Sequence, residues 1–304
     1  MAGLTTTRKD AIPGFFARQL EQIEAQVQEV EYGELAFADG QVVPLEIQNL
    51  PGVRTTTYTQ ITGVGRFKLH RSYSTDIPNI NILMREFSQR VHKWAGKYDF
   101  SDDDIEAAQF VGFPVEQQVV ATVREAAMQE MNTLMALGER SVRMPGLLNH
   151  PDVLRSYSPS TFDANSTSNQ ILEVLNDAVT QIITTTRRVE RPDTLFLPDS
   201  QYNYIATRRL DNTLDTTILR HFLDSSPYIQ NVEPLLECEG AGPDGEDVML
   251  IMRRDPAKLK AMIFQDFEFK EAVRKGLGFE RPATFKYAGI RLYRPFSVHL
   301  VIGI

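Results

Sequence analysis

The spacing of apolar residues predicts one long amphipathic helix from Pro114 to about Leu137. Its apolar residues recur every three or four positions, which places them on one face. They are Val115, Val119, Val123, Ala127, Met131 and Leu134/Met135. Pro114 suits the first helical turn and Gly138 suits the C-terminal cap. A helix of this length spans about 35 Å.

A narrower apolar stripe predicts a second helix over residues 12–31. The stripe consists of Phe16, Leu20, Ile23, Val27 and Val30. Glutamates at 21, 24 and 29 occupy the other faces. So narrow a seam fits two interpretations: packing on its own chain, or docking on a neighbouring molecule. The sequence alone does not decide between them.

Residues 34–75 predict β structure that is poor in apolar side chains. Asp39-Gly40 is a hairpin signal between two short apolar pairs. The segment Val53–Ile61 is rich in β-branched residues, and an alternation resumes at Phe67, Leu69 and Tyr73. A two-stranded unit of this kind is marginal alone in water. We therefore expect it to lie against another subunit, with Tyr58, Ile61 and Phe67 among the contacts.

Residues 76–98 fit either a strand or a helix, with Phe87, Val91 and Trp94 as the ambiguous positions. Ser101 and Asp104 resemble a capping box, so a helix is expected to begin there. The run Asp102-Asp103-Asp104 admits a metal site. Carboxylates that oppose the helix dipole are the simpler explanation.

The second half of the chain predicts alternating helices and strands, and the whole chain is of the α+β class. Helices are expected at 166–190, 202–210 and 214–223. Strands are expected at 194–197, 231–238, 246–253, 262–264, 285–287, 289–293 and 297–304. The glycine-rich segment 240–245 is expected to join two of these strands as a hairpin loop.

The segment Met144–Val153 follows the long helix and is neither an active-site motif nor an ordinary turn. Pro145, Gly146 and Pro151 deny it regular structure. Leu147 and Leu148 are too apolar for solvent, so the turn is expected to pack down as a joint between two parts of the subunit.

Composition narrows the class of protein. The chain has 304 residues, a net charge of −8 and one cysteine. Its acidic balance argues against a dedicated nucleic-acid binder, and one cysteine excludes intrachain disulfides and cysteine zinc cages. The N-terminus lacks the apolar core of a signal peptide, and the apolar runs are too short to span a bilayer.

No sequence motif supports a catalytic function. The five histidines form no HExxH pair, and no phosphate-binding or nucleophile-elbow motif is present. His150 is expected to bond the turn backbone, and Cys238 to be a small core residue in a strand. The pairs Arg187/Arg188, Arg208/Arg209 and Arg253/Arg254 suit either phosphate contacts or ordinary ion pairing. We expect no enzyme activity, cofactor or metal.

The order of these parts resembles the major capsid proteins of tailed bacteriophages with the Hong Kong ninety-seven type fold, and the related encapsulin shells. The matching motifs are Asp76-Ile77-Pro78 before the long helix, Gly146-Leu147-Leu148-Asn149 with Pro151 and Val153 after it, and Tyr293-Arg294-Pro295 before a final strand.

The resemblance implies a map of the subunit. It makes residues 1–33 an N-terminal arm and 34–75 an extended E-loop. Residues 76–153 and 255–295 form the P-domain, with the long helix as its spine. Residues 154–254 and 296–304 form the A-domain around the capsomer axes. Gly146, Leu147, Leu148, Asn149 and Pro151 form the joint between the two domains.

The resemblance also implies a structural function: hexamers and pentamers that close an icosahedral virion head around double-stranded DNA, assembled in the host cytoplasm. The implied partners are the chain itself, a separate scaffolding protein, portal and decoration proteins, and DNA held non-specifically, without a membrane. The short N-terminus leaves no room for a large fused scaffold. The alternatives are an encapsulin-like compartment and an enzyme that uses Cys238 or a carboxylate pair.

Some shells of this type carry an isopeptide bond from an E-loop lysine to a P-domain asparagine. Lys68 suits the first role, but residues 232–304 contain no asparagine. We therefore expect no such crosslink.

Overall fold

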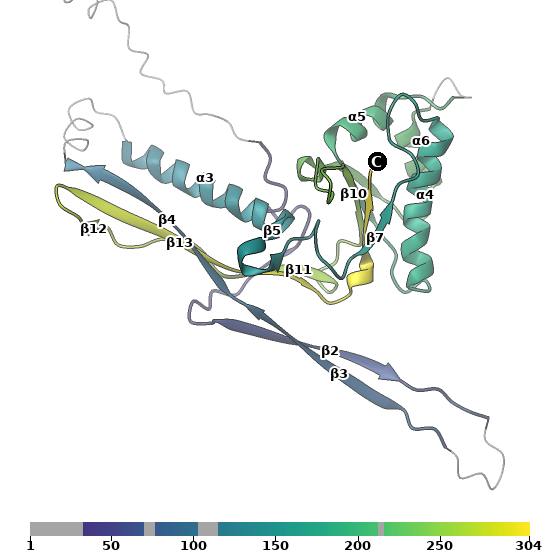
Figure 1. The fold of residues 1–304 in the computed structure, drawn as a ribbon, viewed down its shortest axis with the longest axis horizontal. Helices are drawn as coiled ribbons and strands as arrows, with labels where there is room; N and C mark the ends of the chain where they lie inside the picture. The colour runs from purple at the N-terminus through teal and green to yellow at the C-terminus, as the bar shows by residue number, and fades with distance from the viewer. Residues whose placement is uncertain (1–32, 70–76, 103–114, 212–215) are drawn as a thin grey trace, which may run out of the picture. The chain divides into compact units, whose positions relative to one another are not determined.

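Figure 1 shows the computed structural model, which describes residues 33–69, 77–102, 115–211 and 216–304. The chain divides into residues 1–34 and 35–304. The helix predicted over 12–31, with Phe16, Leu20, Ile23 and Val27, lies outside the described residues. So does nearly all of the helix predicted from Ser101.

The first sheet is built around one long strand, β13, which forms antiparallel pairs with both β4 and β11. Its members are β1 (Leu45–Ile47), β4 (His92–Ser101), β11 (Leu259–Phe269), β12 (Val273–Arg274) and β13 (Gly278–Leu292). The long helix α3 (Val115–Ala136) packs against β4 and β13 (Figure 1). On this sheet Trp94 stacks on Phe285 with 5.7 Å between ring centroids. The helix predicted from Pro114 to about Leu137 is observed as α3.

The three inner strands of the second sheet are buried on both faces. Its order is β7 (Leu154–Tyr157), β14 (Val298–Ile302), β10 (Val248–Met252), β8 (Thr194–Leu197) and β9 (Asn231–Pro234). Alternate residues of β10 enter two cores: Leu250 faces the core shared with the first sheet, and Ile251 faces the helices. These helices are α4 (Ser168–Thr185), α5 (Asp199–Thr207) and α6 (Ile218–Ser225).

A two-stranded hairpin extends from the first sheet (Figure 1). It pairs β2 (Thr55–Val64) with β3 (Asn81–Arg90) in antiparallel register. Only Val91 separates β3 from β4, so one extended segment serves first the hairpin and then the sheet. Within the ambiguous segment 76–98, residues 81–90 and 92–98 are therefore strand. The hairpin also extends beyond the 34–75 segment, and Phe67 and Leu69 lie outside its strands.

The hairpin predicted at Asp39-Gly40 is wrong. Residues 35–40 form a turn whose backbone bonds follow helical spacing, such as Asp39 N–H to Leu35 C=O at 2.9 Å. The side-chain oxygen of Asn132 on α3 accepts from the N–H groups of Phe37 (2.9 Å) and Ala38 (3.2 Å). A buried side chain thus overrides the local turn signal.

The hairpin loop predicted at 240–245 is also wrong, because β9 and β10 do not pair. Strand β8 lies between them. The expected strand 231–238 ends at Pro234 and continues as the short 3-10 helix η2 (Leu236–Cys238). Cys238 is nevertheless fully buried, as expected, and burial raises the pKa of its thiol.

Sequence reasoning located most of the other elements. The strand at 194–197 is β8, and the helix at 166–190 is α4, which begins with a capping box between Thr167 and Gln170. The strands expected at 285–287 and 289–293 are one strand, β13. The helices expected at 202–210 and 214–223 are observed slightly displaced, as α5 and α6.

Candidate assembly site

The proximal half of the hairpin is fastened to its own subunit. The side-chain amides of Gln60 and Gln89 donate to the carbonyls of Tyr293 and Ile290, each at 3.0 Å. Arg291 donates to the Thr56 hydroxyl at 2.8 Å. These bonds attach β2, at Thr56 and Gln60, and the end of β3 to β13 and the residue that follows it.

Aromatic contacts reinforce this anchor. Tyr58 stacks on Phe87 with 5.2 Å between centroids, and its ring meets Tyr293 edge-on. The Arg291 guanidinium lies 5.0 Å from the Tyr58 ring centroid, a favourable cation–π geometry. Burial raises the pKa of Tyr58. Tyr58, predicted as an intersubunit contact, therefore packs on its own chain.

The distal half of the hairpin exposes apolar side chains. Ile61, Ile82 and Met84 are 62%, 65% and 67% exposed. Ile61 and Met84 are cross-strand partners, as are Gly63 and Ile82, so the three side chains share one face. Near the tip, Phe67 and Leu69 are 90% and 91% exposed. The predicted contact residues Ile61 and Phe67 thus belong to an uncovered apolar surface.

A hollow of about 790 Å³ lies between the hairpin and the end of α4. Thr59, Ile61 and Gly63 form its hairpin side. The opposite side includes Val189 and Phe296, which are 57% and 53% exposed. Large apolar side chains therefore line both sides of the hollow.

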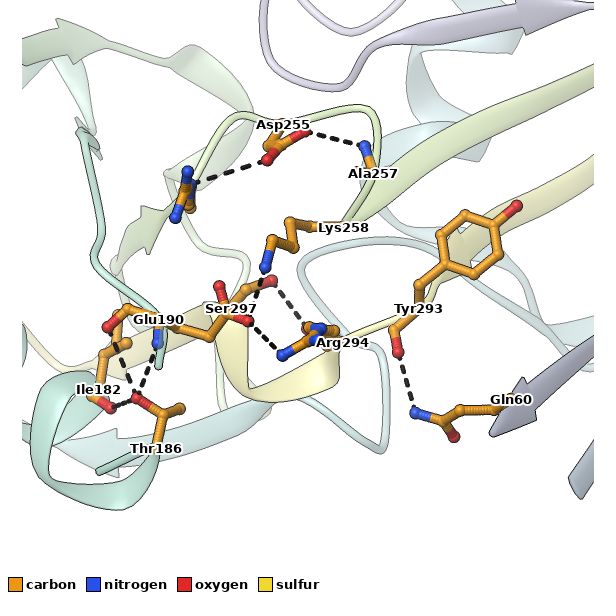
Figure 2. A network of polar contacts seen from close by, with 11 residues as sticks. Gln60, Ile182, Thr186, Glu190, Asp255, Ala257, Lys258, Tyr293, Arg294 and Ser297 are labelled. Atoms are coloured by element: carbon orange, nitrogen blue, oxygen red, sulfur yellow. Dashed lines mark hydrogen bonds and ion pairs between the residues drawn. The ribbon is translucent and has the colours of Figure 1, made fainter. Parts of the chain in front are cut away.

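Glu190 forms the centre of a polar network beside this hollow (Figure 2). Its carboxylate accepts from Lys258 Nζ at 2.8 Å and Arg294 Nη1 at 3.1 Å, and its side chain is only 3% exposed. The Glu190 N–H donates to the Thr186 hydroxyl (3.2 Å), which donates in turn to the Ile182 carbonyl (2.7 Å).

The two cations come from the two segments that connect the sheets. Lys258 immediately precedes β11, and Arg294 lies between β13 and β14. The segments also bond each other directly: Tyr293 N–H donates to Lys258 C=O at 2.8 Å, and Arg253 N–H to Ser297 C=O at 3.2 Å. Glu190 therefore joins the C-terminal end of α4 to both connections.

The turn 144–153 is packed down, as the sequence predicted. Leu147 and Leu148 are buried, and their N–H groups donate to the Met135 and Ala136 carbonyls at the end of α3. The Asn149 side chain accepts from the Gly146 N–H at 2.8 Å and donates to the Leu137 carbonyl.

His150 also fills a structural place in this turn. Its Nδ1 accepts from the Asp152 N–H at 3.3 Å, and its carbonyl accepts from Arg155 at 3.1 Å. Burial lowers the pKa of His150. Gly146 has no room for a side chain, because a Cβ there would lie 2.3 Å from the Ala136 carbonyl oxygen.

Sequence reasoning missed the residues that organise the site. Nothing in the local pattern marks Glu190, Lys258 or Arg294, because they lie far apart in the chain and meet only through the tertiary fold. Asn132 was also missed. A polar residue within the apolar end of α3 was the available signal for it.

The part of the chain that the structure describes holds no group of three or more His, Cys, Asp or Glu side chains suited to a metal ion. Of the Asp102–Asp104 run only Asp102 is described, and its Oδ2 lies 3.5 Å from Nη2 of Arg274. No helix among the described residues is both long and apolar enough to cross a bilayer.

Comparison with solved structures defines the class. The fold is similar to the capsid of Myoviridae phage XM1, with a TM-score of 0.82 and 19% identity over 95% of this chain and 98% of that one. It is similar to Mycobacterium phage Bobi, with a TM-score of 0.65 and 14% identity over 96% and 98%. The virus-like particle from Pyrococcus furiosus scores 0.51 at 13% identity over 88% and 95%. The fold is therefore that of a phage capsid subunit.

The family follows from the sequence. Residues 65–304 match the model of the major capsid protein family, and the chain belongs to that family. It is a structural subunit that assembles with copies of itself into a phage capsid. The encapsulin-like alternative is less supported by these comparisons. A search of curated protein sequences finds no match to the chain.

Proposed function

We propose that this capsid protein forms hexamers and pentamers that close an icosahedral head around double-stranded DNA. The observation that supports the proposal best is the hairpin, whose proximal half is anchored on its own chain while its distal half exposes Ile61, Ile82 and Met84. A monomer gains nothing from such a surface, which is typical of an interaction site. A neighbouring copy would bury it.

The proposed parts of the subunit follow the resemblance with two adjustments from strand pairing. The N-terminal arm remains 1–33. The E-loop becomes residues 48–90, because β1 pairs with β11 of the first sheet and β3 pairs with β2. The P-domain takes β1, residues 91–153 and 255–295. The A-domain takes 154–254 and 296–304, and the turn at 146–151 joins the two.

The remaining proposals concern partners. Assembly takes place in the host cytoplasm with a separate scaffolding protein, and portal and decoration proteins complete the virion. DNA is held without sequence preference. The net charge of −8 supports weak DNA contact, because many neutralised phosphates would produce tight and salt-sensitive binding. The subunit acts through its surfaces, without a catalytic role.

The test replaces Ile61 and Met84 together by serine. Both side chains are more than 60% exposed, so the subunit should fold with an unchanged melting temperature. Shell formation, followed by sedimentation velocity and electron microscopy, should fail. The control replaces Tyr157 and Leu236 together by serine. These side chains are 67% and 57% exposed and lie outside the hairpin. Normal shells from the Ile61/Met84 variant would refute the intersubunit role of the hairpin.

A further inference from the structure

The loop that follows α4 has an unusual backbone. Arg187 and Arg188 have φ values of 51° and 66°, and residues with a side chain adopt this left-handed region at a cost. Such conformations persist only where surrounding contacts enforce them, and they cluster at functional sites. Two in succession on arginines, without glycine, require an explanation.

Surrounding contacts hold this loop firmly. The N–H groups of Arg187 and Arg188 donate to the Thr184 and Ile183 carbonyls at 3.1 and 2.7 Å. Val189 N–H donates to Thr186 C=O at 3.1 Å. The buried Glu190 then fixes the end of the loop through Lys258 and Arg294 (Figure 2). The loop is therefore rigidly presented.

The three arginines of this loop have no partner within the described residues. Arg187, Arg188 and Arg191 are exposed, and no carboxylate of the described chain pairs with them. Between them Val189 is 57% exposed on the rim of the hollow. The result is a preorganised surface of three positive charges beside an apolar patch.

We propose that the loop Arg187–Arg191, together with Val189 and Phe296, docks a carboxylate-bearing surface of a second copy of this chain. The inference rests on the proposed shell, in which copies must meet side by side. Charge complementarity favours a second copy, because each chain carries a net charge of −8 and three unpaired cations attract an excess of carboxylates. Val189 and Phe296 supply the apolar contact that a protein partner uses.

Nucleic acid is the competing partner, and the geometry favours it less. Phosphate-binding surfaces are strongly positive and polar, whereas here the exposed apolar side chain of Val189 lies between the arginines in the chain and lines one hollow together with Phe296. The hollow also contains the apolar Ile61 of the hairpin. These residues would gain little from a phosphate backbone.

The experiment compares two triple variants of equal charge. The test variant carries Arg187→Gln, Arg188→Gln and Arg191→Gln. The control carries Arg220→Gln, Lys270→Gln and Lys275→Gln, three cations already paired within their own chain. Shell formation by the full chain is followed by light scattering against protein and salt concentration. The test variant should need about tenfold more protein for half-assembly and should lose salt sensitivity, and the control should not.

A second variant separates docking from folding. Arg187→Gly with Arg188→Gly removes two charges and relieves the left-handed strain, so the subunit should unfold no more easily while assembly weakens. Test and control variants that assemble alike would overturn the inference. So would normal shells that lose encapsidated nucleic acid, since that result assigns the loop to DNA. A wild-type chain that forms no shell would instead refute the proposed function.

Discussion

At the scale of single residues, Glu190 bonds to both of the segments that connect the two sheets. Its side chain is almost fully buried between Lys258 and Arg294. Replacing Glu190 by glutamine removes the charge but keeps the size, and leaves both cations without a counter-ion. We expect the free energy of unfolding of the unassembled subunit to fall by about 2 kcal/mol, measured by urea denaturation.

The expected loss of unfolding free energy is smaller than for a fully buried ion pair, because the Arg294 side chain is 53% exposed and solvent screens its charge. The exposed carboxylate Glu239 gives the control, since Glu239→Gln removes the same charge without a buried partner. Equal stabilities for the two variants would show that Glu190 does not join the sheets.

His299 is the residue that should make stability depend on pH. It is fully buried on β14. Its Nδ1 lies 3.0 Å from the Ala178 carbonyl and must donate to it, so Nε2 accepts from the Ser156 hydroxyl at 2.8 Å. Burial lowers the pKa of His299 below its ordinary 6.5.

Because the folded-state pKa is the lower one, the unfolded chain binds a proton first as the pH falls below about 6.5. Folding stability should therefore be fully present at neutral pH and decline on acidification, by up to about 1.4 kcal/mol per pH unit from this group. His150 adds to the slope, since burial lowers its pKa as well.

Urea denaturation at pH 7, 6 and 5 checks this expectation. His299→Gln should flatten the pH dependence relative to the wild type. His221 is exposed on α6, so His221→Gln should leave the dependence unchanged. An unaltered slope in the His299 variant would contradict the assignment.

At the scale of elements, the end of α3 depends on Gly138. Its φ is 70°, and a Cβ there would lie 2.2 Å from the Met144 carbonyl oxygen. Gly138→Ala should therefore cost more than backbone strain alone. Gly245 also has a positive φ, 84°, but open space around it. Gly245→Ala should therefore show the cost of the backbone strain alone, about 1 kcal/mol.

Thermal unfolding of the two alanine variants provides the measurement. The Gly138 variant should melt several degrees below the Gly245 variant, because the turn 144–153 must shift away from α3. Similar melting temperatures would mean that the turn is not packed as tightly against the helix as the structure shows.

Elements with a strong periodic pattern and clear end signals could be predicted from the sequence. The apolar faces of α3 and α4 suffice for their assignment, and the continuous apolar run of β8 marks a strand buried on both faces. The turn at 144–153 was also predictable, because two leucines among prolines and glycine require cover.

The predictions failed where a distant residue decides the local structure. Asn132 holds 35–40 as a turn, although Asp39-Gly40 favours a hairpin. Strand β8 intervenes between β9 and β10, so the glycines at 240–245 join strands that never pair. Glu190 and its two cations are equally non-local. The intersubunit contact predicted for Tyr58 stays a prediction, although its ring also packs against Arg291 of its own chain.

At the scale of the whole molecule, one core connects both sheets while the hairpin stays outside it. Phe285 of β13 and Leu300 of β14 share this core with the end of α3. The distal hairpin contributes nothing to it and remains exposed. The core therefore forms without the distal hairpin, and we expect the hairpin surface to serve contacts between copies.

Those contacts should be entirely non-covalent. An isopeptide bond from Lys68 would need an asparagine side chain to receive it, and residues 255–295 of the proposed P-domain contain none. The asparagines of its other segment, Asn132 and Asn149, are hydrogen-bonded within their own chain. Purified shells boiled in detergent should therefore run as a single band at 34.5 kDa. A ladder of covalent multimers that disappears in a Lys68→Arg variant would contradict this expectation. If the hairpin surface forms the proposed contacts between copies, urea should dissociate shells of the Ile61→Ala variant at a lower concentration than those of the wild type.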